Sequence, residues 1–346
     1  MTLESLFLAL HGAGRVASPE TPAIELQSNH SPWYTRVLLG GMGWLGGMFV
    51  LGFMGALVSG LFNNAFAMTV LAVIMFVSSF AIYRIANNND FGTQFALAAS
   101  ICGQALAAAA FAKWAGRGVD SSSVAWFIAL MQVALVWVMP NFLHRLISTM
   151  FAVTALFFAT QKGGASIAID LMLGLGFVGL IQYESQLVAS KQRALSEPVL
   201  NGLAIGLLVV GVAYLDFVGG TTWLPFATMS AIAFGIALMV WVVSATKHLP
   251  LNSRGAALGA ALAFAAVAWR APGLIATSLV LLASFAASRR TLTALAMLAL
   301  MGYLSTYYYP MSLTLLVKAG VLALTGAVLL VLWWVHRQYF SSEAAS

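Results

Sequence analysis

Two charged side chains fall within long apolar stretches, where a charge is costly, and they are the first candidates for chemistry. Lys318 comes in the run that begins at Ser312, about 10 Å along a helix rising 1.5 Å per residue. Asp170 comes one turn after Ser166, in another apolar run. A charge in the bilayer interior costs at least about 2.5–3.5 kcal/mol, so such residues usually face a bundle interior and a partner. The sequence therefore predicts that Asp170 and Lys318 pair, at a site that binds a substrate or gates a pathway.

Two structural interpretations stand beside this one. The four-carbon stem of Lys318 would let its ammonium reach the headgroups at the outer surface. A buried pair of Asp170 and Lys318 would otherwise fix helix packing and have no further role.

Other polar residues fall at the ends of apolar runs on the side predicted to be the outer one. They are Asp216, Arg270, Tyr307, Tyr308 and Tyr309. Tyrosine at the end of a span usually belongs to an interfacial belt. Three consecutive tyrosines cannot all face one direction of a helix, so we expect at least one hydroxyl to point into the bundle. With the two buried charges, these residues would form a polar vestibule open to the outside, a hypothesis from topology rather than from a motif.

The sequence carries no pattern typical of catalysis, of a cofactor or of a metal. It has no HExxH, no CxxC, no phosphate loop and no paired-carboxylate motif. The five histidines are scattered and none lies deep in an apolar run, so haem or metal ligation inside the bilayer is not expected. We name no catalytic residue and expect no cofactor.

The composition indicates the class of protein in which Asp170 and Lys318 are positioned. Hydrophobic residues make up 61% of the 346 and charged residues 8%, with a mean hydropathy of +0.93; soluble chains are about 45–50% apolar and about 25% charged. Ten carboxylates cannot solvate such a surface, and Cys102 has no internal disulfide partner. The net charge of +6 is spread between apolar runs and makes no nucleic-acid patch. What remains is a polytopic membrane protein, with membrane lipids as its surroundings.

From Arg36 onward, apolar runs alternate with short polar breaks, and a span needs about 20 residues. We expect an all-α, polytopic transmembrane helix bundle of about 12 helices. The predicted spans are 37–60, 65–83, 91–112, 123–139, 146–160, 166–183, 199–215, 223–245, 255–269, 273–288, 291–308 and 312–335. The short runs at 255–269 and 273–288 would alternatively form a re-entrant pair.

The predicted domains follow from these spans. Residues 1–36 form a cytoplasmic tail in which Thr2 to His11 has the spacing of a short amphipathic helix. Residues 37–338 form the transmembrane domain, and 339–346 a second cytoplasmic tail. A similar order of features in the first and last six spans predicts a 6+6 parallel repeat, with halves 37–190 and 198–338.

The placement of lysine and arginine predicts the orientation. With a cytoplasmic N-terminus, the outer loops hold only Lys113, Arg117, Lys162 and Arg270, while eleven cations fall on cytoplasmic segments. Positive residues favour the cytoplasmic side, so both termini are predicted to be cytoplasmic.

Small and amide side chains predict contacts between helices. Gly43 and Gly47 have the small-xxx-small spacing that lets two helices approach closely, and Gly174, Gly176 and Gly179 suggest the same for their span. Gln104 and Gln132 lie within spans, where an amide acts as interhelical glue.

Two stretches resemble an uncharacterised family of bacterial inner-membrane proteins that carries a domain-of-unknown-function label. Pro32-Trp33-Tyr34, with Gly43-Trp44 after it, resembles the start of that family's membrane region. Tyr307-Tyr308-Tyr309 with Ser312-Leu313 and Lys318 resembles its C-terminal signature, from which Thr314 departs. The resemblance implies a multi-pass protein of the bacterial inner membrane. It also implies a small membrane-anchored partner encoded nearby, and it implies no activity.

Three functions fit these observations. The first is a transporter-like or channel-like subunit with a polar site in the outer leaflet. The second is a non-catalytic membrane scaffold subunit that works with a membrane-anchored partner. The third and weakest is a membrane enzyme on a lipid-linked substrate, because the loops are nearly empty of the acids and cations such chemistry needs.

Overall fold

The computed structural model describes residues 38, 41–49, 52–53, 63–85, 90–116, 120–160, 165–190, 192–217, 224–269 and 271–308, without the side chains of 214–217, 224–227 and 306–308. These residues form helices and short turns, and no strand occurs among them. The predicted all-α class is therefore confirmed. The chain divides into two compact units, residues 1–103 and residues 104–346.

In the first unit, helix α4 (Ala65–Ile85) packs against the first part of α5 (Asp90–Ala115). The buried residues of α4 recur every three or four positions and make one stripe along the helix: Met68, Ala72, Met75, Ser79 and Tyr83. Within this stripe the Ser79 hydroxyl donates a hydrogen bond of 2.7 Å to the Ala96 carbonyl. Most of the remaining residues of α4 are apolar and half-buried or exposed, as expected for a helix that faces lipid.

Residues 41–49 are also helical and lie close to α5 within the same unit. A Cβ on Gly43 would stand 2.8 Å from the Phe91 carbonyl oxygen, and one on Gly47 would stand 2.6 Å from the Cβ of Ala98. Only glycine fits at these distances, so the close approach predicted from Gly43 and Gly47 is confirmed. The Trp44 indole adds a hydrogen bond of 3.1 Å to the Gln94 side chain.

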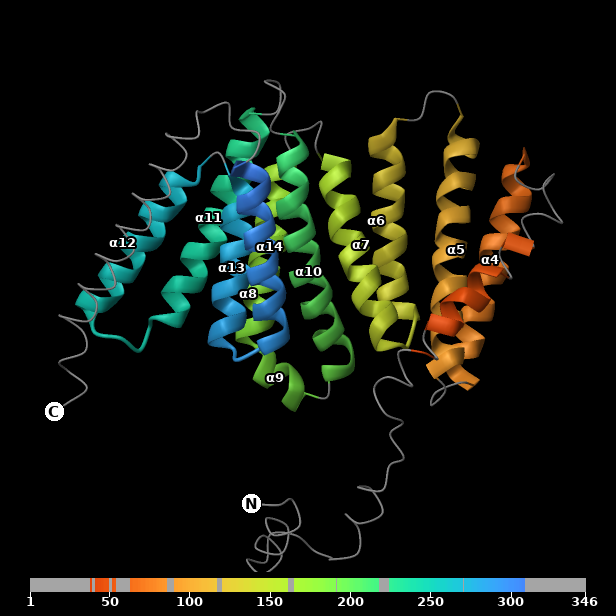
Figure 1. Cartoon of the computed structure of the whole chain (residues 1–346), viewed down its shortest axis with the longest axis horizontal. Helices are drawn as coiled ribbons and strands as arrows, with labels where there is room; N and C mark the ends of the chain where they lie inside the picture. Colours follow the sequence, from red (N-terminus) through yellow and green to blue (C-terminus); the bar gives the residue numbers. More distant parts are fainter. Residues whose placement is uncertain are drawn as a thin grey trace, which may run out of the picture. The chain divides into compact units, whose positions relative to one another are not determined.

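The second unit begins within α5 and continues through helices that alternate in direction along the chain (Figure 1). They are α6 (Ser121–Val138), α7 (Phe142–Thr160), α8 (Ser166–Gln182), α9 (Glu184–Ala189), α10 (Arg193–Phe217), α11 (Leu224–Ala245), α12 (Leu251–Val267), α13 (Pro272–Ala286) and α14 (Arg290–Tyr308). The alternation follows from the short breaks, because a few residues can only return the chain beside the helix it has left. The short helix α9 lies in a break where the sequence predicted no helix.

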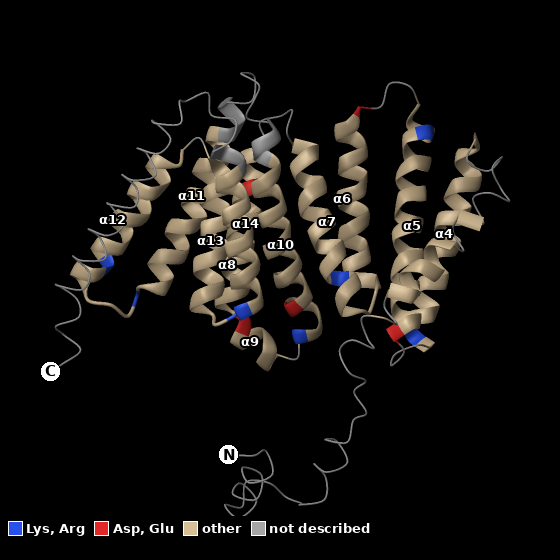
Figure 2. Cartoon of the chain, viewed as in Figure 1, with Lys and Arg blue, Asp and Glu red and all other residues tan. Residues whose placement is uncertain are grey.

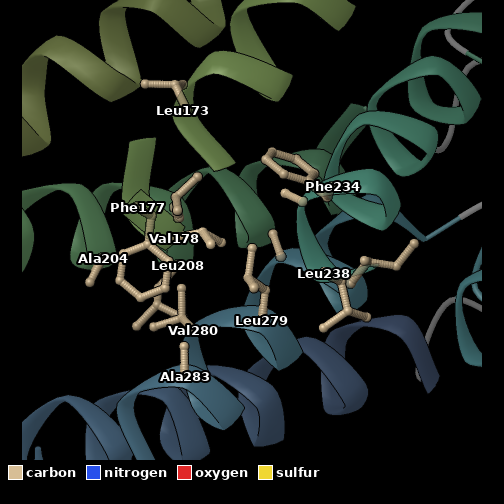
Figure 3. Packing of buried hydrophobic residues seen from close by; sticks show 14 of the residues in the cluster. Leu173, Phe177, Val178, Ala204, Leu208, Phe234, Leu238, Leu279, Val280 and Ala283 are labelled. Atoms are coloured by element: carbon tan, nitrogen blue, oxygen red, sulfur yellow. The ribbon is translucent and has the colours of Figure 1, made fainter. Parts of the chain in front are cut away.

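Helix α10 is the centre of this unit and contacts α7, α8, α13 and α14. A hydrophobic core forms around it, and Figure 3 shows residues of α8, α10, α11 and α13 meeting in this core. Phe177, Leu207 and Leu279 are among its fully buried members. Helix α13 is buried between α10, α11 and α14, whereas α12 is mostly exposed and contacts α11.

Glycines let α10 approach its neighbours at backbone distance. A Cβ on Gly202 would meet the Leu146 carbonyl and stand 2.7 Å from the Thr149 Cβ, and one on Gly206 would stand 2.8 Å from the Val153 Cβ. These two residues have small-xxx-small spacing and form the contact with α7. One turn further, Gly211 lies against Gly273 of α13, and Tyr303 of α14 closes over Gly273.

Each predicted span between residues 65 and 308 coincides with one helix, and the spans 37–60 and 312–335 fall largely or wholly outside the described residues. Among the described helices, α4, α5, α6, α7, α10 and α11 are long and apolar enough to cross a membrane, and α8, α12, α13 and α14 are shorter apolar helices. The part of the chain that the structure describes is therefore helical and holds six candidate membrane spans. The twelve-span count, the 6+6 repeat, the domain limits and the choice between crossing and re-entry at 255–288 stay predictions.

Replacing Gly202 or Gly206 with alanine tests the contact between α7 and α10. We expect each substitution to destabilise the protein by about 1–3 kcal/mol, because the new methyl group overlaps α7. Thermal unfolding of the purified chain in detergent measures the effect. The control is Gly179→Ala in α8, whose Cβ would meet nothing within 4 Å. Equal melting temperatures for the α10 variants and the control would contradict the close approach.

Candidate functional site

Asp170 of α8 is the charged residue that the structure places most deeply. Its exposed fraction is 1%, and the fully buried Ser230 of α11 donates a hydrogen bond of 2.5 Å to its carboxylate. Ser166 lies one turn before Asp170 on α8 and is 2% exposed. The arrangement is a buried carboxylate that accepts a hydrogen bond from one hydroxyl group, with a second buried hydroxyl group one turn earlier on α8.

The packing of α8 on α11 explains why these groups meet. Asp170, Gly174 and Phe177 follow one face of α8 at spacings of four and three, and Ser230, Phe234 and Ala237 do the same on α11. Gly174 brings the helices together, since a Cβ there would stand 2.8 Å from the Cβ of Ala237. Asp170 and Ser230 are the polar pair at one end of this seam, and the Gln182 amide of α8 donates to the Ser244 hydroxyl of α11 at its other end. Of the span's three glycines, Gly174 makes the predicted close contact; a Cβ on Gly176 would have ordinary room, and one on Gly179 would meet nothing.

The other predicted site residues fall outside the described side chains. Lys318, Arg270 and Tyr309 lie outside the described residues, while Asp216, Tyr307 and Tyr308 have described backbone only. Asp216 is near the end of α10, and the two tyrosines end α14. These helix ends and the start of α8 lie at the same end of the second unit (Figure 1). The pairing of Asp170 with Lys318 and the vestibule stay predictions.

The opposite end of this unit holds an ion-pair network that sequence reasoning missed. The Arg289 guanidinium binds both carboxylate oxygens of Glu184 and donates a hydrogen bond of 3.0 Å to the Asn201 side chain. It thereby ties the turn between α13 and α14 to α9 and α10. Arg289 is one of the eleven cations on the predicted cytoplasmic segments, and its partner was not predicted because residues 105 positions apart give no local signal of contact.

Arg145 of α7 donates hydrogen bonds to two backbone carbonyls. Neither carbonyl has a helical N–H donor, because a proline stands four residues after each of them. Its Nε donates to the Val136 carbonyl at 3.1 Å, and its Nη1 donates to the Ala194 carbonyl at 2.8 Å. The residues four positions after these two carbonyls are Pro140 and Pro198, which have no N–H to offer. A single guanidinium thus completes the end of α6 and the first turns of α10. The positions of the two prolines were the sequence signal that could have identified this role.

The two amides within spans bind each other. Gln132 of α6 donates a hydrogen bond of 2.8 Å to the Gln104 side chain on α5, and both are buried. The prediction that these amides join helices is therefore confirmed. The sequence did not identify them as a pair.

A double-mutant cycle tests the role of Arg145. Arg145→Gln leaves the Ala194 carbonyl without its donor, whereas Pro198→Ala returns an N–H to that carbonyl from its own helix. We expect the destabilisation caused by Arg145→Gln to be smaller by about 1–2 kcal/mol in the Pro198→Ala background, as measured by unfolding in detergent.

Pro272→Ala is the control for this cycle, because Pro272 occupies the first turn of α13, where an N–H has no helical acceptor. Coupling of Arg145 to Pro272 as strong as that to Pro198 would contradict the proposed role.

The comparisons with known proteins give a family and no activity. The family model described as Domain of unknown function (DUF4401) matches residues 32–339. No curated protein matches the chain, and no solved structure does. The match covers most of the chain, including both stretches that carry the resemblance noted above. The chain therefore belongs to the DUF4401 family, a domain of unknown function.

Proposed function

We propose that this protein is a transporter-like or channel-like membrane subunit in which Asp170 binds or passes a cation. The observation that carries the proposal is the burial of the Asp170 carboxylate on α8, a short apolar helix of a chain whose described part has six candidate membrane spans. Acidic residues inside membrane segments commonly mark ion pathways or proton relays. A charge in the bilayer interior costs free energy, so such residues are rarely kept unless they have a function.

The chemistry around Asp170 favours a cation. The neighbouring groups are the Ser230 hydroxyl, which donates to the carboxylate, and the buried Ser166 one turn earlier. Carboxylate and hydroxyl oxygens suit a proton or a hard metal cation. In this proposal Lys318 neutralises Asp170 when no cation is bound. Asp216, Arg270 and one of Tyr307, Tyr308 and Tyr309 extend the polar path toward the outer surface.

The proposal includes a bacterial inner-membrane location with both termini in the cytoplasm. Its support is the distribution of positive residues in the second unit, where Lys and Arg gather at the starts of α7, α10, α12 and α14 (Figure 2). These starts lie at the end opposite to that of Asp170, so the positive-inside tendency supports an outer-leaflet position for Asp170. A small membrane-anchored protein encoded nearby remains the proposed partner.

The scaffold function is the second candidate, and one observation favours it. Asp170 and Ser230 join α8 to α11 on the same seam as the tight contact of Gly174 with Ala237. A polar pair at such a seam is also what a purely structural fastener between two helices requires. The two functions differ in the expected effect of removing the Asp170 charge on cation flux through the protein.

Cation flux through reconstituted protein tests the proposal. The full chain is placed in liposomes, and movement of protons, Na⁺ and K⁺ is followed with ion-sensitive dyes under an imposed gradient. We expect flux of at least one of these cations above that of protein-free liposomes, and a loss of about tenfold or more in Asp170→Asn, because an amide cannot neutralise a cation.

Asp120→Asn is the matched control, since Asp120 caps the start of α6 and asparagine caps equally well. It should keep the wild-type flux. Wild-type flux in Asp170→Asn together with a lower melting temperature would establish the scaffold function instead. Absence of flux for all three cations in the wild-type protein would overturn the transport proposal.

A further inference from the structure

An apolar groove opens between helices at the end of the second unit opposite to Asp170. Its volume is about 310 Å³, and its walls come from α6, α7, α8, the short helix α9 and α10. Val133 and Trp137 of α6 line it and are 47% and 68% exposed, so the groove opens sideways toward the surroundings of the bundle. Sites that bind small ligands have similar volumes and are mainly apolar, with few polar groups.

Arg145 lies beside this groove, one turn before the lining residue Thr149 on α7. It shares a face of α7 with Thr149 and Ala152, which line the groove, and side chains on a helix lean toward its N-terminus. The two carbonyls that Arg145 binds belong to Val136, a lining residue, and to Ala194, which precedes the lining residue Leu195. The guanidinium therefore connects two walls of the groove.

The charge of Arg145 is not neutralised by a carboxylate within the described part of the chain. Its hydrogen bonds there go to the two carbonyls, and the ion pairs found there are Arg193–Glu197 and Arg289–Glu184. A guanidinium has more N–H donors than two carbonyls use, so donors remain for an anion. The apolar groove complements an acyl chain, and the cation beside it complements the anionic headgroup to which such a chain is attached.

We propose that this groove binds one anionic phospholipid, with an acyl chain between α6 and α10 and the phosphate at Arg145. Arginine binds phosphate oxygens with fixed geometry. Basic pockets between membrane helices on the cytoplasmic side bind anionic headgroups. The sideways opening admits a chain from the bilayer, and Trp137 near the end of α6 stands where tryptophan meets headgroups. The site is independent of Asp170 and of any transported cation.

Lipid-dependent thermal stability tests the proposal on the full chain in neutral detergent. Phosphatidylglycerol and phosphatidylcholine with identical acyl chains are added in separate arms, and inorganic phosphate is added in a third. We expect phosphatidylglycerol to raise the melting temperature by about 5 °C or more over phosphatidylcholine, and free phosphate to add nothing. Native mass spectrometry of the purified protein should show one retained anionic phospholipid.

Two pairs of variants locate the effect. Val133→Trp fills the groove, while Val240→Trp changes an equally apolar residue of α11 that is 43% exposed and lies elsewhere. Arg145→Gln removes the proposed phosphate ligand, while Arg254→Gln removes a cation of α12 at the same end of the unit. We expect Val133→Trp and Arg145→Gln to lose the difference between the two lipid arms and the controls to keep it. Because each variant is compared with itself in two lipids, a change in its basal stability cancels.

Val199→Phe fills the groove from α10 and replaces Val133→Trp if that variant does not fold. Equal shifts in both lipids would overturn the proposal, as would an unchanged difference in the groove variants or a loss in Arg254→Gln as large as that in Arg145→Gln. A shift with inorganic phosphate as large as that with phosphatidylglycerol would assign Arg145 to a free anion and reject the lipid.

Discussion

A backbone carbonyl inside a bilayer must find its donor within the protein, because lipid offers none. Pro140 and Pro198 remove two such donors from α6 and α10, and Arg145 of α7 replaces both. Three helices are thereby fixed at one end by a single side chain. Helix α10 then carries the contacts to α8, α13 and α14, so the packing of the second unit extends outward from this point.

The buried carboxylate and the ion-paired groups of the second unit lie at different ends of its helices. The Arg289–Glu184 pair and Arg145 lie toward one end, Asp170 and Ser230 toward the other, and the apolar core of α8, α10, α11 and α13 lies between them. Ion pairs near a membrane surface remain partly hydrated and cost little, as the 36% exposure of the Glu184 side chain illustrates. The Asp170 carboxylate is buried and lacks this hydration. Its burial is therefore the feature that bears most directly on function.

The sequence predicted the positions of helices well because length and hydropathy are local properties. The runs at 65–83 and 223–245 became α4 and α11 almost residue for residue, whereas α9 was missed because six residues carry too little periodicity. Side-chain partners are decided by packing between distant segments. Asp170 was identified as buried, but Ser230, sixty positions away, gave no signal. Arg145 is one of the eleven cations on the predicted cytoplasmic segments, and its carbonyl partners were not predicted although the spacing of two prolines pointed to them.

The glycines of α10 restrict how this protein can move. Gly202 and Gly206 place its backbone against α7, and Gly211 places it against Gly273 of α13. Helices in such contact cannot slide past one another without a collision of main chains. Any rearrangement that exposes a pathway alternately to the two sides of the membrane would have to carry α7, α10 and α13 together as one rigid block. The moving surface would then be found around α12, whose main contact among the described helices is with α11.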